Sequence, residues 1–525
     1  MRAFADLLDR IILTPSRNGK LDALKHYFST VPDPERGYAL GAIAGALSFQ
    51  GAKPAALRTL AAERTDAALF ALSYDYVGDL AETIALIWPE NTGANYAPSL
   101  TEAVETLKVA SRLEAPRLIA RWLDALSANE RWALLKLTTG GLRIGAGARL
   151  AKQALADWAD RDVSEIEEIW HGQTPPYLEL FAWLEGRCER PTGLAAAPFR
   201  PVMLAHALDA DDIERLDASA FAAEWKWDGV RVQAVSDNGV KRLYSRAGED
   251  VSRAFPDLVE ALSFEGVLDG ELLVRDADGN IATFNDLQQR LNRKTVDAKL
   301  IARFPAFIRA YDLLIDGEDD IRALPYRARR ARLADFVARA GSTRIDLSPI
   351  LAAQAWAGFA ALRAAPAHPA IEGLMLKTWD SPYVAGRPRG LWWKWKRDPF
   401  RIDAVLMYAQ RGHGKRSSLY SDFTFGVWRD EALTPVGKAY FGFTDAELAQ
   451  LDKFVRDNTI ERFGPVRAVK ADKETGLVLE IAFEGLQRSG RHKSGVAMRF
   501  PRIARIRWDK PAAEADTLET LEKLF

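Results

Sequence analysis

Lys226 is the residue of this sequence whose surroundings most clearly suggest covalent chemistry. It lies in Glu224-Trp-Lys-Trp-Asp-Gly-Val-Arg231, where a turn-forming Asp-Gly pair follows a short run that predicts a strand. A lysine amine becomes a nucleophile once it is neutral, so a lysine fixed at a strand end can carry covalent chemistry. Taken alone, the Lys-x-Asp-Gly pattern is a weak signal, because an exposed lysine on a hairpin has the same sequence.

Charged residues recur downstream beside other apolar runs that predict strands. Ser245-Arg-Ala-Gly248 follows the next predicted strand, and Val267-Leu-Asp-Gly-Glu271 places a carboxylate at a strand end. Tyr311-Asp312 ends another apolar run, and Ile371-Glu-Gly373 repeats the pairing of strand and carboxylate. Trp392-Trp-Lys-Trp-Lys396 puts two lysines two positions apart, on one face of a strand. Each segment alone has an ordinary explanation, either as a solvated strand end or as lysines that protect a sheet edge. The occurrence of all of them in this order is not explained in that way.

In this order the segments resemble the motifs of the ATP-dependent DNA ligases, members of the covalent nucleotidyltransferase superfamily. The resemblance covers nearly the whole chain. The matching segments are Lys226-Trp-Asp-Gly229, Ser245-Arg-Ala-Gly248, Leu268-Asp-Gly-Glu271, Tyr311-Asp-Leu-Leu314, Glu372-Gly-Leu-Met-Leu-Lys377, Lys394-Trp-Lys396 and Arg507-Trp-Asp-Lys510. Phe284-Asn-Asp-Leu-Gln-Gln-Arg-Leu-Asn-Arg-Lys294 is also typical of these ligases. Gly141-Leu-Arg-Ile-Gly145 resembles the minor-groove-contacting loop of their helical DNA-binding domain.

The resemblance implies a reaction in three steps that begins at Lys226. The amine attacks the α-phosphate of ATP, expels pyrophosphate and forms a lysyl-adenylate; it needs a lowered pKa, which neighbouring cations such as Lys394 and Lys396 can supply. The AMP then passes to the 5′-phosphate of a nick in duplex DNA, and the adjoining 3′-hydroxyl displaces it. Both transfers depend mainly on positioning and charge stabilisation. The implied role is nick sealing in DNA replication, repair or recombination.

Other residues of the matching motifs suit binding of ATP and Mg²⁺, with Mn²⁺ as an alternative metal. Phosphate charge would be offset by Arg231, Arg246, Lys394 and Lys396. Glu271 and Glu372 are hard oxygen ligands that suit Mg²⁺ beside substrate phosphates, so Glu271 also belongs to the nucleotide site.

Two further residues fit the base of the nucleotide. Tyr311 offers a flat face for adenine stacking, at a position where phenylalanine is common in the family. By resemblance, Glu224 accepts a hydrogen bond from the adenine amino group. One arginine stays ambiguous, because the family position six residues before the first lysine of the pair is Pro388 here, with Arg387 and Arg389 on either side.

The chain is expected to fold as several domains, since 525 residues are too many for one core. Residues 1–190 have the pattern of short amphipathic helices and predict an all-α domain, which by resemblance binds DNA. Residues 200–398 mix strands and helices, an α+β pattern that by resemblance forms the ATP-grasp-like adenylation (nucleotidyltransferase) domain. Residues 399–525 have short strands separated by glycines or polar loops, which predicts a small β-barrel, by resemblance an OB-fold.

Local signals add particular elements to this plan. Ser127 and Glu130 form a capping box that starts a helix. Asp237-Asn-Gly239 predicts a hairpin turn, and a second hairpin is predicted from 267–274 through a turn at 276–279 to Ile281. Helices are predicted at 284–294 and 325–340, and C-terminal strands at 402–409, 422–428 and 476–484.

Nicked duplex DNA is the partner that the resemblance implies. The glycines around Arg143 would let backbone amides approach phosphates, although an ordinary loop between helices has the same composition. A second candidate, which can equally be a solvated turn, is the basic loop that holds Arg411, His413, Lys415 and Arg416. The last motif, which by resemblance serves the adenylation step, holds Arg507, Asp509 and Lys510.

Composition bounds these expectations. The formal net charge is −1, which excludes a uniformly basic coat, yet basic residues gather at 387–401 and 488–510 while acids gather at 316–320. The single cysteine, Cys188, excludes an intramolecular disulfide and a four-cysteine zinc site. No stretch reaches the roughly 20 apolar residues of a membrane span, so we expect a cytoplasmic monomer without membrane contact.

Two enzymes of the same superfamily and one non-enzyme are the alternatives. An NAD-dependent ligase shares Lys-x-Asp-Gly but resembles a chain with a cysteine zinc finger, which one cysteine cannot build. An mRNA capping guanylyltransferase shares the core but lacks the helical N-terminal domain. A DNA-end-binding protein that had lost catalysis would have lost charged motif residues, and these are all present here.

Overall fold

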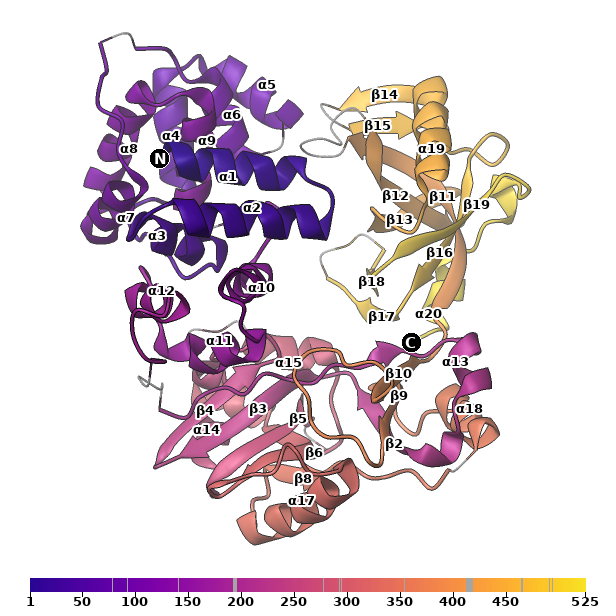
Figure 1. Cartoon of the computed structure of the whole chain (residues 1–525). Helices are drawn as coiled ribbons and strands as arrows, with labels where there is room; N and C mark the ends of the chain where they lie inside the picture. Colours follow the sequence, from indigo (N-terminus) through magenta and orange to yellow (C-terminus); the bar gives the residue numbers. More distant parts are fainter. Residues whose placement is uncertain are drawn as a thin grey trace. The chain divides into compact units, whose positions relative to one another are not determined.

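The computed structural model describes residues 1–525 except 78, 92, 140, 192–195, 277, 292, 294, 354, 412–418, 464, 465, 491 and 493. The chain forms two compact units, whose elements are labelled in Figure 1. One unit is Lys152–Arg397, and the other combines Met1–Ala151 with Asp398–Phe525.

The first 190 residues form helices, and no strand occurs among those that the structure describes. The helices are α1 (Arg2–Leu13), α2 (Arg17–Thr30), α3 (Glu35–Ile43), α4 (Pro54–Arg64), α5 (Ala67–Val77), α6 (Leu80–Ile87), α7 (Leu100–Val109), α8 (Glu114–Ala125), α9 (Ala128–Thr139), α10 (Ala148–Ala159), α11 (Val163–Ile169) and α12 (Leu178–Leu184), with a 3₁₀ turn η1 (Trp170–Gly172). The expectation of an all-helical stretch is confirmed. None of the described helices has the length and apolarity needed to cross a membrane.

Apolar stripes and caps explain these helices. In α1, the side chains of Leu7, Leu8 and Ile11 lie on one buried face. Before α9, the backbone N–H of Ser127 donates to the Glu130 carboxylate at 3.1 Å, and the Glu130 N–H donates to Ser127 Oγ at 3.5 Å. The predicted capping box is therefore present.

Two sheets form the centre of the unit Lys152–Arg397. The first has the strand order β1-β10-β9-β2; the second has the order β4-β3-β5-β6-β7, with β8 beside β6. The strands are β1 (His206–Ala207), β2 (Phe221–Trp227), β3 (Val230–Asp237), β4 (Val240–Ser245), β5 (Gly266–Val274), β6 (Ala306–Asp316), β7 (Asp319–Asp320), β8 (Ile345–Leu347), β9 (Ile371–Thr378) and β10 (Trp392–Lys396). The helices are α13 (Ala210–Arg215), α14 (Pro256–Glu260), α15 (Phe284–Leu291), α16 (Ala298–Arg303), α17 (Tyr326–Ala340) and α18 (Trp356–Ala364).

The first predicted hairpin is present, and the second is reduced to a short antiparallel contact, in which the Ala282 N–H donates to the Val274 carbonyl at 2.9 Å. Asn238 and Gly239 connect β3 to β4 with φ angles of 49° and 78°, as a tight hairpin turn requires. After β5, by contrast, the described residues form an isolated bridge between Arg275 and Ile281, and β5 pairs along its length with β3 and β6. β5 is therefore a central strand with a neighbour along each edge, and most of its side chains are buried on both faces.

Some predicted boundaries are also wrong. Glu271 and Tyr311 lie inside β5 and β6 rather than at strand ends, because both strands continue through the charged positions into buried apolar residues. The helix predicted at 284–294 ends at Leu291 as α15, and positions 292 and 294 lie outside the described residues. The helix predicted at 325–340 is found as α17.

The stretch Asp398–Phe525 is rich in strands, and most of them join one sheet, called here the C-terminal sheet. Its order is β13-β12-β11-β15-β14, and β16 pairs with both β11 and β19. The strands are β11 (Phe400–Arg411), β12 (Tyr420–Arg429), β13 (Ala432–Ala439), β14 (Thr459–Phe463), β15 (Val466–Val469), β16 (Val478–Phe483), the separate pair β17 (Gly485–Arg488) and β18 (Val496–Arg499), and β19 (Arg502–Arg507). The helices are α19 (Asp445–Asn458) and α20 (Leu518–Glu522).

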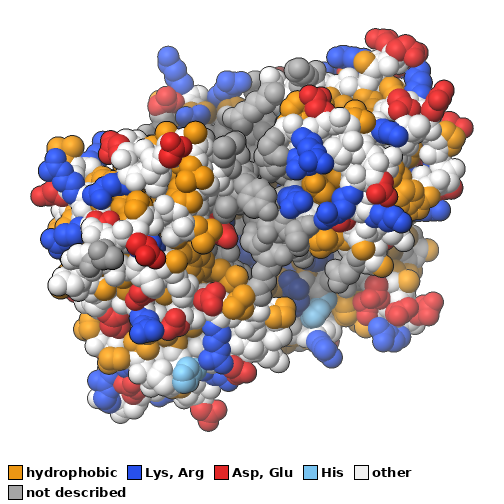
Figure 2. Space-filling view, turned by 90° about the horizontal axis from the view of Figure 1, so that it is seen from above, with side chains coloured by type: hydrophobic (Ala, Val, Ile, Leu, Met, Phe, Trp, Pro, Cys, Tyr) orange, Lys and Arg blue, Asp and Glu red, His pale blue; other side chains and the backbone are white. Residues whose placement is uncertain are grey.

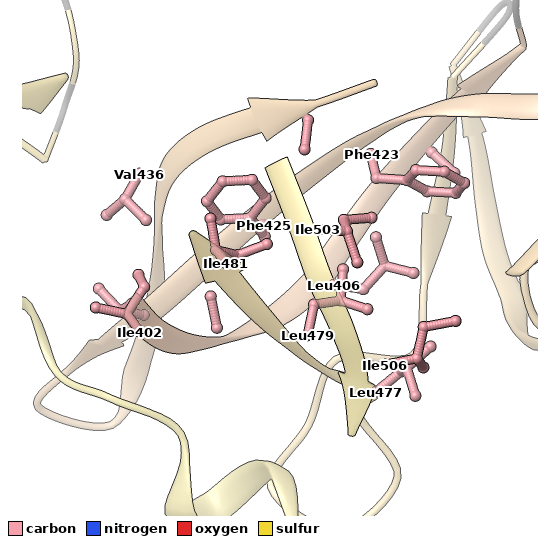
Figure 3. Packing of buried hydrophobic residues seen from close by; sticks show 14 of the residues in the cluster. Ile402, Leu406, Phe423, Phe425, Val436, Leu477, Leu479, Ile481, Ile503 and Ile506 are labelled. Atoms are coloured by element: carbon pink, nitrogen blue, oxygen red, sulfur yellow. The ribbon is translucent and has the colours of Figure 1, made fainter. Parts of the chain in front are cut away.

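Alternating apolar residues of these strands make one core. Phe423, Phe425, Leu479 and Ile481 are buried there and lie close together in Figure 3. The strands predicted at 402–409, 422–428 and 476–484 are β11, β12 and β16. Helix α19 and the remaining strands were not predicted.

Candidate active site

Lys226 is the last residue but one of β2, and Trp227 separates it from the tight turn of Asp228 and Gly229. The Asp228 N–H donates to the carbonyl of Ala370 at 2.7 Å, which fixes the turn. A Cβ atom at Gly229 would lie 2.5 Å from the Leu272 carbonyl oxygen and 2.8 Å from Glu271 Cγ. The sequence needs glycine here because the turn packs directly against β5.

The amine of Lys226 donates to Glu372 Oε2 at 2.5 Å, and Lys396 Nζ lies 3.8 Å from the same oxygen. Lys226 stands opposite Gly373 in the β2–β9 pair, and Lys396 stands opposite Gly373 in the β9–β10 pair. Gly373 has a φ of 145°, and a Cβ there would lie 2.2 Å from the Trp395 carbonyl oxygen. Only glycine allows the backbone that brings these side chains together.

Lys394 lies on the same strand as Lys396, and further cations surround it. Burial lowers the pKa of Lys394, and the nearby positive charges of Arg387, Lys226, Arg246 and Lys396 lower that pKa further. The sequence prediction that Lys394 and Lys396 share one site with Lys226 is consistent with this geometry. Arg387 and Arg389 are both exposed, and of the two it is Arg387 whose charge acts on Lys394.

The loop that carries Arg246 packs against the turn Trp170–Gly172, which follows α11. His171 packs its ring 5.1 Å from the ring of Tyr244 and 5.5 Å from that of Phe199. A Cβ atom at Gly248 would lie 2.9 Å from His171 Nε2, so this loop approaches the imidazole closely. Glu168 of α11 also contacts Arg322 at 3.4 Å.

Two carboxylates face this cluster. Burial raises the pKa of Glu271 to about 8; Lys226 and Arg231 oppose the rise, and the negative charge of Glu372 adds to it. Two carboxylates that disfavour each other's charge are a suitable donor pair for a divalent cation, which would relieve that repulsion. No group of three or more His, Cys, Asp or Glu side chains suited to a metal occurs among the described residues. Mg²⁺ held by two carboxylates is completed by water or by substrate phosphates.

Glu224 is buried beneath the cluster and is already bound within the protein. Lys377 Nζ lies 2.8 Å from Glu224 Oε1, and the Tyr326 hydroxyl donates to the same oxygen. Lys377 also donates to the Tyr311 carbonyl at 3.1 Å and lies 4.5 Å from the centre of the Tyr311 ring. The adenine-site candidates Glu224 and Tyr311 are therefore joined by Lys377.

Arg231 contacts protein groups on several sides. Its Nε and Nη2 donate to the two oxygens of Asp269 at 3.0 and 2.6 Å, and Nη1 donates to the Met203 carbonyl at 2.6 Å. Tyr383 donates to Asp269 as well, at 2.7 Å. These contacts tie Arg231 into the sheet, so they do not support its predicted contact with phosphate.

Sequence reasoning missed several residues that hold the site. Asp269 and Asp312 are completely buried acids inside matching motifs, and each binds an arginine far along the chain, Arg231 and Arg329. The available signal for these residues was an acid inside an apolar motif. The arginines that bind the two acids lie 38 and 17 residues away in the sequence, so no local pattern identifies them.

The remaining candidates belong to the other unit. Arg143 is exposed with a φ of 48°, between the buried side chains of Leu142 and Ile144. Arg411 ends β11 with its guanidinium 5.5 Å from the Tyr420 ring centre, while Lys415 and Arg416 lie outside the described residues.

The last motif is internally paired. Arg507 Nη2 lies 3.0 Å from Asp509 Oδ2, and Lys510 Nζ lies 2.7 Å from Asp403 Oδ2. The hydrogen bond from Arg507, followed by smaller contributions that include the charges of Arg507 and Arg505, lowers the pKa of Asp509 to about 2.

Comparison with known proteins shows which family the chain resembles. A family model described as "ATP dependent DNA ligase domain" matches residues 202–396, and one described as "ATP dependent DNA ligase C terminal region" matches residues 416–510. A "Probable DNA ligase" of Koribacter versatilis is 33% identical over 437 residues, which cover 78% of this chain and 74% of the relative. A "DNA ligase" of Methanococcoides burtonii is 30% identical over 421 residues, covering 77% and 71%.

A solved structure agrees with these matches at the level of the fold. The structure named Pmar-Lig_PreS3 superposes with a TM-score of 0.61 at 16% identity, over 96% of this chain and 99% of that one. The resemblance predicted from the motifs is confirmed by the family models and the relatives. This chain belongs to the ATP-dependent DNA ligases, which seal nicks in DNA through a lysyl-AMP intermediate.

Proposed function

We propose that Lys226 is the residue that carries AMP in this ligase. The observation that supports this best is the position of its amine, 2.5 Å from Glu372 and within a cluster of cations. An amine attacks only in its neutral form, so Lys226 must leave Glu372 before it attacks the α-phosphate of ATP. The surrounding positive charge attracts the polyphosphate.

Four cations are assigned to the phosphates of ATP and of the adenylated nick: Arg246, Arg387, Lys394 and Lys396. Arg387 is preferred to Arg389 because its charge acts on Lys394. Lys394 and Lys396 are fixed on β10, and Arg246 and Arg387 lie in loops. Charged donors held in place stabilise the charge that develops on phosphate oxygens during transfer. Arg231 is assigned to support of this site through Asp269.

The adenine is assigned to Tyr311 and Glu224. The ring of Tyr311 offers a stacking face. Tyr326 and Lys377 both contact Oε1 of Glu224, and a carboxylate can accept a further hydrogen bond from an adenine amino group through its second oxygen.

Glu271 and Glu372 are assigned to Mg²⁺, with Mn²⁺ as an alternative. The raised pKa of Glu271 and its closeness to Glu372 support a site that gains from a cation. Bound there, the ion would offset the negative charge of the nucleotide phosphates.

The other parts of the chain are assigned to DNA and to the adenylation step. Residues 1–190 would form the helical DNA-binding domain, 200–398 the nucleotidyltransferase domain and 399–525 an OB-fold barrel. DNA contacts are assigned to Arg143, Arg411, Lys415 and Arg416, and the adenylation step to Arg507, Asp509 and Lys510. We expect a cytoplasmic monomer that binds nicked duplex DNA.

Labelled nucleotides test the proposal. The protein is incubated with Mg²⁺ and ATP, GTP or NAD, each labelled in the nucleoside monophosphate portion, and then given a nicked duplex. We expect covalent label from ATP and sealing of the nick. Retention of label from GTP or NAD alone would exclude this function, as would adenylation of the protein without any sealing of DNA.

A further inference from the structure

Asp403 lies in β11, the first strand of the C-terminal sheet, and its side chain is 14% exposed. Its backbone is fixed on two sides. The Asp403 N–H donates to Asp516 Oδ2 at 2.7 Å, and the Asp516 N–H donates to the Asp403 carbonyl at 2.8 Å. Asp403 also stands opposite Glu480 in the β11–β16 pair. The carboxylate is thus held in place by the sheet.

This carboxylate binds both cations of the last motif. Lys510 Nζ lies 2.7 Å and Arg507 Nη1 lies 3.2 Å from Asp403 Oδ2. The other face of Arg507 is bound by Asp509 at 3.0 Å. Arg507 ends β19, while Lys510 belongs to the turn that follows it, so Asp403 connects the turn to the strand.

We propose that Asp403 is a positioning residue for the adenylation step, because it holds Arg507 and Lys510 in the arrangement in which they meet the phosphates of ATP. The inference rests on the proposed function of this motif. Arginine and lysine side chains have many rotamers, and a partly buried carboxylate that binds both removes many of them before the substrate arrives. A misplacement of about 1 Å can slow a positioned reaction by about 100-fold.

The charges around Asp403 also suit this role. Arg505, Arg507 and Lys510 lie beside two carboxylates, Asp403 and Asp509, and Arg505 Nη2 is 3.8 Å from Asp509. Glu480, opposite Asp403, adds a third carboxylate and is paired with Arg401. The four cations and three carboxylates of the group therefore keep a net positive charge of one, which attracts a polyphosphate. Asp403→Asn removes the negative charge that holds Arg507 and Lys510. Of the two carboxylates beside these cations, Asp509 alone then keeps its charge.

The test separates adenylation from nick sealing. For Asp403→Asn in the full chain, we expect single-turnover adenylation with α-labelled ATP to slow by about 10- to 100-fold, as for other misplaced catalytic groups. Sealing of a nick that already carries 5′-AMP, which bypasses the first step, is expected to keep its rate. Asp403→Glu keeps the charge and is expected to retain more adenylation than Asp403→Asn.

Matched variants show which claim has failed. Asp422→Asn removes a similar acid of the same sheet, 3.6 Å from Lys438, and is expected to leave both steps unchanged. Lys510→Ala is expected to slow adenylation, and Asp403→Asn should then add little to it, because one residue acts through the other. If Lys510→Ala adenylates normally, the proposed role of the motif is wrong.

Other outcomes overturn the role of Asp403 itself. If Lys510→Ala is slow while Asp403→Asn adenylates as the unchanged protein does, the carboxylate positions nothing. If Asp403→Asn slows both steps equally, or if Asp403→Glu is the slower variant, Asp403 serves the stability of the sheet. Thermal unfolding of each variant, measured beside the rates, identifies loss of the folded protein.

Discussion

Glu372 shows how one carboxylate can serve several partners at the residue scale. It binds the amine of Lys226 at 2.5 Å and lies 3.8 Å from Lys396. Burial raises the pKa of Glu271, and the charge of Glu372 adds a smaller rise. The proposed nucleophile is therefore bound by the same group that is proposed to bind the metal. A charged pair in a partly buried site is sensitive to any change in its neighbours, because solvent screens it weakly.

Arg387 and Arg389 allow a direct comparison between neighbouring residues. Arg387→Ala is expected to weaken ATP use in the adenylation step by about 10-fold, because a charge-assisted hydrogen bond contributes about 1.5 kcal/mol. Arg389→Ala is expected to change little. The measurement is the ATP dependence of single-turnover adenylation, and a larger loss for Arg389→Ala would reverse the assignment.

At the scale of elements, the sequence patterns predicted the strand and turn around Lys226, the first hairpin and the start of α9. They did so because each signal is local: an alternating run, an Asn-Gly pair, a capping box. They could not predict that Asp269 binds Arg231 or that Asp403 binds Lys510. These pairs join residues 38 and 107 positions apart, and only the assembled sheets bring them together.

Glycine at 373 is the element-scale feature on which the site depends most. Gly373→Ala is expected to lower the thermal midpoint on the order of 10 °C, since a backbone clash combined with a left-handed φ costs about 3 kcal/mol. Gly390→Ala is the control, because Gly390 also has a positive φ, 78°, but open space around it. An equal fall in thermal midpoint for both variants would mean that backbone strain, and not the contact with β10, causes the loss of stability.

His171 makes the contact between the helical segment and the sheets dependent on pH. Burial, with a smaller effect from Lys152, lowers its pKa to about 4, against an opposing effect of Asp250. The unfolded chain takes up a proton below pH 6.5, while the folded one stays neutral to about pH 4, so this stability is complete above pH 6.5 and is lost as the pH falls towards 4.

The expected loss is about 2 kcal/mol in that interval, reduced from the full linkage because the ring is partly exposed. Denaturant unfolding of the protein and of His171→Gln between pH 4 and 7 measures it. The variant is expected to lose less stability over this interval than the unchanged protein. Parallel curves for the two proteins would contradict the pKa of His171.

At the scale of the whole molecule, the net charge of −1 conceals an uneven distribution. On the face in Figure 2, Lys and Arg side chains are interspersed with Asp and Glu and do not form a uniform coat. The cations at the active site gather around Lys394 instead. Affinity for DNA therefore depends on particular basic groups rather than on total charge.

Arg143 tests this view of DNA binding. If it contacts a phosphate, Arg143→Ala is expected to weaken binding of a nicked duplex and to reduce the slope of log K against log salt concentration by about 1. Arg2→Ala removes an exposed arginine from α1 and serves as the control. An unchanged slope for Arg143→Ala would show that this loop does not meet the DNA backbone.

The central claim is that AMP is attached to Lys226, and one measurement tests it most directly. The protein is incubated with ATP and Mg²⁺ in the absence of DNA, digested, and the peptide that carries the mass of AMP is sequenced by mass spectrometry. The account predicts AMP on Lys226 and no adenylated peptide from Lys226→Ala, which should still seal a pre-adenylated nick in part. AMP on any other residue, or sealing of ordinary nicks with ATP by Lys226→Ala, would contradict it.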